Sequence, residues 1–177
     1  EQGINAQEIR MTEDDPEWRV YANLMECLYR ESPVKVPVAG TVESIQQITP
    51  QVLYDCHRAF YTPGNMVLVC VGDVEMEKVA AIAEEILPAE RGEDIPRDYG
   101  REEDPVPCCK EKELAMEVSM PQFLGGYKCR PCGGGEELLR RSIIGDMACD
   151  VLFGDSSPLY ARLYEAGEIN GSLGGNF

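Results

Sequence analysis

The chain has 177 residues, of which 44% are hydrophobic, so it is long enough for one sizeable domain or two small ones and is not wholly disordered. Its 16 Lys and Arg residues against 32 Asp and Glu residues give a formal net charge of −16. This charge argues against nucleic acid or an anionic membrane as a main partner, because both bind basic surfaces. No apolar run approaches the length of a membrane span, and no signal-peptide pattern opens the chain.

The first predicted element is a helix that begins at Glu1 and reaches Met11. Glu1 and Glu8 stand two turns apart on one face of this helix. Ile4 and Met11 fall beside that stripe, which predicts that the face turns into the fold. Two inward carboxylates are costly unless a cation or hydrogen-bond donors meet them, and metal coordination is one way to do so. A solvated acidic helix face is the alternative, and the helix taken alone favours it.

Later helices carry clear start and stop signals. Capping residues predict helix starts at Asp15–Pro16, Thr41, Thr49–Pro50 and Ser157–Pro158. Apolar residues at helical spacing predict one further helix that ends before Pro88 and another, with a Leu139, Ile143, Met147 and Val151 stripe, that ends at Gly154.

Two stretches have strand character. The continuous apolar run Met66–Gly72 predicts a buried central strand with Cys70 as a core residue. Residues 113–120 predict a second strand, with residues 123–128 as a candidate extension. Helices and strands mix without regular alternation, which favours an α+β fold with an antiparallel or mixed sheet. Between them, charged residues interrupted by Gly and Pro predict a linker over residues 89–108.

The cysteines give weak functional signals. Cys129 and Cys132 form a C-x-x-C pair, but Cys108 and Cys109 are adjacent, so the second pair of a zinc ribbon is lacking and loop thiols are the better interpretation. With eight cysteines in a chain that is not a short disulfide scaffold, a reducing cytoplasm is expected. The glycines at 133–135 lack a following G-K-[ST], and His57, Met116 and Met120 are more typical of helix-surface or core positions than of ligands.

Four segments in order along the chain match the pattern of one family. They are residues 1–9 with their glutamates seven apart, G-T…I…I-T over 40–49, Y-x-P-x-N-M with G-D-V over 61–74, and S-S-x-L-Y-x-x-L over 156–163. The chain therefore resembles the M16 metallopeptidases, the pitrilysin/insulinase and mitochondrial-processing-peptidase family, and within it the bacterial YmfH type.

This resemblance implies a zinc site with an H-x-x-E-H motif and a downstream glutamate as third ligand. Glu8 would be that metal ligand, and Glu1 would be a second acidic residue beside the metal and its ligands. The sequence contains no H-x-x-E-H, and its single histidine is His57. The chain would then be a fragment that lacks two His ligands and the general-base Glu, and would be inactive alone.

The resemblance also implies a fold and a function. The fold would be the two-layer α/β metallohydrolase (LuxS/MPP-like) fold, with the C-terminal part of a first M16 domain at 1–88, the linker at 89–108 and the start of a second domain at 109–177. The parent would be a bacterial zinc endopeptidase acting on peptides or small proteins, and the alternative is a non-catalytic M16-like partner or scaffold subunit. The strands that precede Glu1 in the family's first domain would be missing from this chain. Its sheet would then have unpaired edges, and the chain would self-associate or pair with another M16 half.

Overall fold

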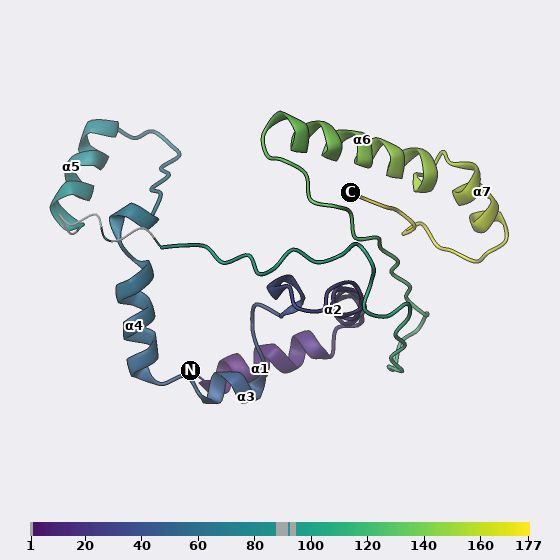
Figure 1. Ribbon diagram of the computed structural model, residues 1–177, viewed down its shortest axis with the longest axis horizontal. Coiled ribbons are helices and arrows are strands. Elements are labelled where there is room, and N and C mark those ends of the chain that lie inside the picture. Colours follow the sequence, from purple (N-terminus) through teal and green to yellow (C-terminus); the bar gives the residue numbers. More distant parts are fainter. Residues whose placement is uncertain (1, 88–91, 93–94) are drawn as a thin grey trace. The chain divides into compact units, whose positions relative to one another are not determined.

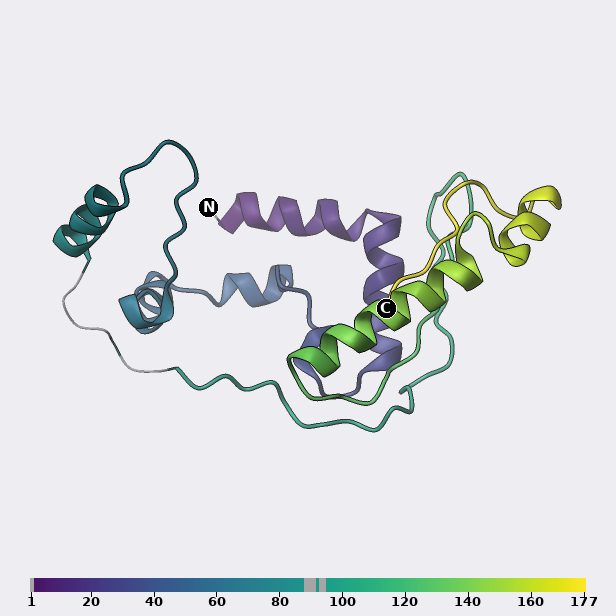
Figure 2. The ribbon, with the colours of Figure 1, turned by 90° about the horizontal axis from the view of Figure 1, so that it is seen from above.

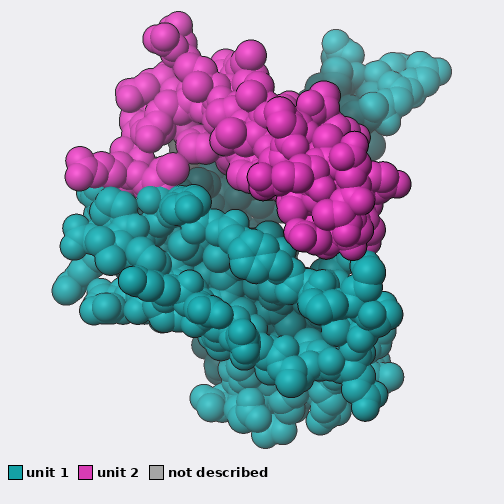
Figure 3. All heavy atoms as spheres, turned by 90° about the vertical axis from the view of Figure 1, so that its right-hand side faces the viewer, with its two compact units in different colours: residues 1–128 teal, residues 129–177 magenta. Residues whose placement is uncertain are grey.

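The computed structural model describes residues 2–87, 92 and 95–177 (Figure 1). The chain divides into two compact units, residues 1–128 and residues 129–177 (Figure 3). Helices are the regular elements of the described residues, and no strand is found among them. The predicted α+β character therefore stays a prediction, as does the domain boundary at 89–108, part of which lies outside the described residues.

The first unit contains α1 (Gln2–Glu13), α2 (Pro16–Leu28), α3 (Val42–Gln46), α4 (Pro50–Phe60) and α5 (Met76–Ile86), with two 3-10 turns, η1 (Pro33–Lys35) and η2 (Pro63–Asn65). The second unit contains α6 (Glu136–Phe153) and α7 (Pro158–Glu165). Among the helices so described, none combines the length and the apolar character needed to cross a membrane.

The predicted helix starts are confirmed. Asp15, Thr49 and Ser157 each accept a backbone N–H of the first turn that follows, and a proline occupies the first turn in each case. Thr41 and Ser44 form a reciprocal capping box, in which each side-chain oxygen accepts the other residue's backbone N–H, at 3.2 and 2.9 Å. These contacts satisfy amide groups that have no partner within the helix.

In the first unit, α1 contacts both α2 and α3 (Figures 1 and 2). The buried apolar residues of this unit are Ile9 on α1, Cys27 and Leu28 in the last turn of α2, and Ile45 on α3. Gln2 fastens the beginning of α1 to the end of α3, because its amide nitrogen donates to the carbonyls of Ile45 and Ile48 at 3.2 and 2.9 Å. The buried Ile9 and the Gln2 hydrogen bonds therefore fix the orientation of α1.

The predicted inward face of α1 is wrong. Ile4 and Met11 are 62% and 67% exposed, whereas Ile9 is 4% exposed. At about 100° per residue, Ile4 and Met11 lie roughly 140° and 200° around the helix from Ile9. The one isoleucine that reaches α3 decides the rotation of the helix, and the other two apolar residues are left on the opposite side.

The predicted buried strand at Met66–Val71 is also wrong. This segment has no regular structure, and its side chains are exposed, with Val67 at 89% and Val71 at 94%. Cys70, predicted as a core residue, is exposed as well, and residues 113–120 likewise form no strand. A strand needs a neighbouring strand for its backbone and a covering layer for its side chains, and no sheet among the described residues supplies either.

In the second unit, the last residues of the chain lie along α6, which contacts α7. The backbone N–H of Phe177 donates to Asp146 at 2.9 Å, and the Phe177 ring lies so close to Gly145 that a Cβ added there would clash with it. The predicted apolar stripe of α6 is nevertheless exposed, with Leu139 at 61% and Val151 at 72%. The C-terminal segment thus covers a different part of the helix, near Gly145.

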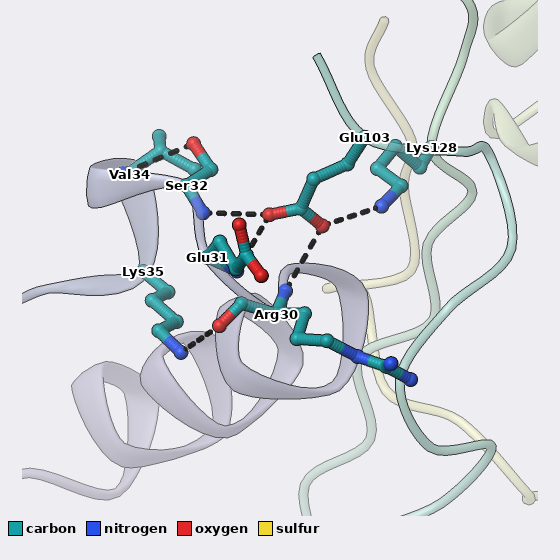
Figure 4. Close-up of polar contacts among 7 residues, drawn as sticks. All are labelled: Arg30, Glu31, Ser32, Val34, Lys35, Glu103 and Lys128. Carbon is teal, nitrogen blue, oxygen red and sulfur yellow. Dashed lines mark hydrogen bonds and ion pairs between the residues drawn. The ribbon is translucent and has the colours of Figure 1, made fainter. Parts of the chain in front are cut away.

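A single carboxylate connects the linker segment to the end of α2 (Figure 4). Glu103 accepts the backbone N–H groups of Arg30, Glu31 and Ser32 at 3.0, 2.7 and 2.6 Å. Lys128 donates to the same carboxylate at 3.0 Å, and its side chain is only 6% exposed. The chain segments around residues 30, 103 and 128 are therefore held together by one anionic group.

These donors lower the pKa of Glu103 from 4.5 to about 2, first through the three backbone N–H groups and then through Lys128. All four donors favour the ionised carboxylate, because a hydrogen bond to the charged form opposes protonation. Lys128 also lies over the Tyr29 ring, with its Nζ 5.1 Å from the ring centroid, which holds the cation beside the end of α2.

The lowered pKa predicts an acid-dependent loss of stability. The contribution of Glu103 to the free energy of unfolding should be complete above pH about 4.5 and should fall as the pH approaches about 2, because the unfolded chain binds the proton first. Glu103→Gln should be less stable at neutral pH and lose less stability between these pH values. Urea unfolding followed by circular dichroism from pH 2 to pH 7 measures both effects, with Glu102→Gln as the neighbouring exposed control. A Glu103→Gln profile parallel to that of the wild type would refute this role.

Candidate functional site

Glu8 lies on α1 at the edge of a hollow between α1, α3 and the turn before α3. The hollow has a volume of about 330 Å³ and is lined by Asn5, Glu8, Ile9, Thr12, Ala39 and Ile45. Two of these residues, Ile9 and Ile45, belong to the buried core, and Glu8 itself is exposed. The hollow therefore has an apolar floor and one carboxylate at its rim.

The backbone around Glu8 is fixed from both sides. The Thr12 hydroxyl donates to the Glu8 carbonyl at 2.9 Å within α1. The next residue, Ile9, is buried, and at the beginning of the helix Gln2 is bound to the end of α3. The position of the Glu8 carboxylate is thus set by a helix with two anchors, while its side chain stays accessible from solvent.

The described residues do not form a zinc site by themselves. Zinc in proteins takes three or four His, Cys, Asp or Glu ligands, and in the part of the chain that the structure describes no three such side chains come together. Glu8 is the one acidic residue among the described residues that line the hollow. Glu1, the other predicted site residue, lies outside the described residues, so the structure does not bring the pair together.

The remaining sequence candidates lie apart from this hollow. His57 is exposed on α4 and stacks on Tyr61, with ring centroids 4.8 Å apart and planes 10° from parallel, which confirms a helix-surface position. Cys129 is exposed and Cys132 half-buried in the segment before α6. Met116 is half-buried, whereas Met120 is 52% exposed, so the core position predicted for Met120 is wrong.

The structure reveals one cluster that the sequence reasoning did not find. The sulfur atoms of Cys27, in the last turn of α2, and Cys109 lie 3.0 Å apart. Burial, followed by the contact with Cys109, raises the pKa of the Cys27 thiol to about 11. Beside the thiols, Lys112 forms an ion pair with Glu26. No sequence spacing could indicate this pair, because 82 positions separate the two cysteines.

Comparison with known proteins finds similarity to one peptidase family. A family model described as "Peptidase M16 inactive domain" matches residues 47–174. A protein of Bacillus subtilis (strain 168) named uncharacterized zinc protease YmfH is 40% identical over an alignment that covers 100% of this chain and 42% of that protein. A Mycobacterium leprae (strain TN) protein named uncharacterized zinc protease ML0855 is 34% identical over 85 residues, which are 48% of this chain and 19% of that protein.

A solved structure supports the same relationship. The crystal structure of an M16-like peptidase from Alicyclobacillus acidocaldarius matches with a TM-score of 0.73 and 28% identity, covering 99% of this chain and 45% of that one. The chain thus spans less than half the length of YmfH and of this crystallised relative. Residues 47–174 fill most of the chain, and α1 with Glu8 precedes them. From the family match over these residues, with the M16-like structure to support it, the chain belongs to the M16 peptidase family.

Proposed function

We propose that this chain is part of a zinc-dependent endopeptidase in which Glu8 supplies one of the zinc ligands. The observation that carries the proposal is the position of Glu8, an accessible carboxylate on an anchored helix at the rim of a hollow. The alignment of the whole chain, at 40% identity, with a protein named a zinc protease supports zinc as the metal. The other ligands and the general base would come from residues outside these 177.

Within this proposal, Glu1 is a second acidic residue near the metal. It precedes Glu8 by seven positions, which places the two residues on one face if the helix begins at Glu1. A carboxylate in that place orients metal ligands through hydrogen bonds rather than binding the metal itself. The substrate class would be peptides or small proteins, and the whole protein would act in a bacterial cytoplasm.

One observation favours the alternative of a non-catalytic partner or scaffold. The family model that matches residues 47–174 is described as an inactive domain, and this range holds most of the chain. Both functions are compatible with two M16 domains that meet in a linker at 89–108, with residues 1–88 in the first and 109–177 in the second. Zinc binding by the whole protein distinguishes them, because only the peptidase requires it.

We also propose that the apolar segment 66–71 mediates association of this chain with a second chain. The segment is apolar and exposed from Met66 at 48% to Val71 at 94%. Exposed apolar segments with unpaired backbone groups recruit other chains. The partner would be a second copy or another M16 half.

For the metal, Glu8→Gln in the whole protein should abolish peptide hydrolysis and lower zinc content, because a neutral amide is a much weaker zinc ligand than a carboxylate. Zinc per protein by atomic absorption and turnover of a quenched fluorescent peptide measure both. Glu13→Gln on the same helix is the control and should change neither. Full zinc content and turnover in Glu8→Gln would show that Glu8 is not a ligand.

For the second acidic residue, Glu1→Gln in the whole protein should retain zinc more fully than Glu8→Gln and lower activity by about 10–100-fold. The reason is that its carboxylate would act on the metal ligands and not on the metal. Zinc affinity by chelator competition, measured beside turnover, separates the two residues. Equal loss of zinc in both variants would contradict the assignment.

For assembly, the isolated chain should self-associate in a concentration-dependent way through residues 66–71. Val69→Lys should shift the species toward monomer, because a charge opposes burial of this segment. Val38→Lys, at a residue exposed elsewhere in the first unit, should leave association unchanged. Sedimentation velocity over a concentration series gives the result, and a wild-type monomer throughout would rule out association by this segment.

A further inference from the structure

The two thiols at the end of α2 belong to different segments of the first unit. Cys27 is buried in the last turn of α2, and Cys109 is exposed in the segment that follows the linker. Their sulfur atoms lie 3.0 Å apart, about 1 Å more than the length of a disulfide bond. Forming that bond would thus require only a small displacement of the two side chains.

Contacts besides the thiols hold the two segments together. The backbone N–H groups of Cys108 and Cys109 both donate to the Cys27 carbonyl, at 2.7 and 3.3 Å. Lys112 forms an ion pair with Glu26, the neighbour of Cys27 on α2. The thiols are therefore brought together by a backbone arrangement that does not depend on them.

We propose that Cys27 and Cys109 are an oxidisable dithiol that forms an intramolecular disulfide by exchange with a small-molecule disulfide such as oxidised glutathione. The two cysteines are free thiols in the structure. This modification is independent of the peptidase function proposed above, because neither cysteine lines the hollow at Glu8.

The exposure of the two residues sets the order of the exchange. The Cys109 thiolate, which solvent reaches, attacks the small disulfide, forms a mixed disulfide and releases one thiolate, which takes up a proton. Cys27 then loses its proton and attacks the Cys109 sulfur, which breaks the mixed disulfide and releases the second small thiol. The two protein thiols give up two electrons and two protons, and the small disulfide is reduced to two thiols.

Cys27 is suited to the second step rather than the first. It is buried, and its raised pKa keeps it protonated at neutral pH, so it does not compete for the external disulfide. Once Cys109 carries the mixed disulfide, the reacting sulfur lies beside Cys27. The new bond would join positions 82 apart and restrict the unfolded chain, which raises the unfolding temperature.

Oxidation of the full 177-residue chain with glutathione disulfide, followed by alkylation and trypsin digestion, tests the proposal. Trypsin places Cys27 alone in the peptide Val20–Arg30 and both Cys108 and Cys109 in the peptide Glu102–Lys110. The expected product is a cross-link between these two peptides, with a mass lower by two hydrogens than their sum. The unfolding temperature should rise on oxidation and return when dithiothreitol is added.

Two matched variants assign the bond. Cys108→Ser should keep the cross-link and the temperature shift, and Cys109→Ser should lose both; because Cys109 is exposed, its circular dichroism should match that of the wild type. The proposal is overturned if Cys27 is alkylated while Cys109 still carries glutathione. It is equally overturned if the cross-link survives in Cys109→Ser, or if the only disulfides found are Cys108–Cys109 or Cys129–Cys132.

Discussion

The first unit depends on how the chain continues beyond the end of α2. The backbone N–H groups of residues 30–32 follow the helix and point to one acceptor, the Glu103 carboxylate, which also receives Lys128 (Figure 4). A carboxylate that receives four donors, one of them a charged ammonium group, is among the strongest hydrogen-bond acceptors available to a protein. The segments around Glu103 and Lys128, which have no regular structure, are therefore positioned by the residues that follow α2.

The sequence predictions are accurate where the interacting residues are close in sequence and fail where they are far apart. Asp15, Thr41 and Ser157 were identifiable as caps because their partners lie two or three residues away. The burial of residues 66–71 depends on a neighbouring strand, and the sequence pattern could not show that this partner is missing from the described residues. The contacts of Glu103 with residues 30–32 and of Cys27 with Cys109 join positions 71 to 82 apart, for which a single sequence contains no spacing signal.

At the candidate site, too, the sequence identified a residue but did not predict the contacts that position it. Glu8 was named from a resemblance, and the structure places it on a helix that is held by Gln2 and Ile9. The rotation of that helix could not be derived from its apolar residues. Ile4, Ile9 and Met11 lie on different sides of the helix, and only Ile9 is buried, on the side that faces α3. A polar residue, Gln2, has a larger part in positioning the carboxylate than the apolar stripe that first indicated the face.

The attachment of Glu103 to residues 30–32 has a consequence for variation in chain length. It closes a loop whose ends are 71 positions apart, and the entropy of closing so long a loop changes slowly with length. Doubling such a loop costs only about 0.6 kcal/mol. Insertions and deletions in the irregular connections between α4 and the linker segment should therefore be tolerated, provided that Glu103 and the three amides stay in place. An insertion or deletion of one residue between Arg30 and Ser32 would instead misalign the donors.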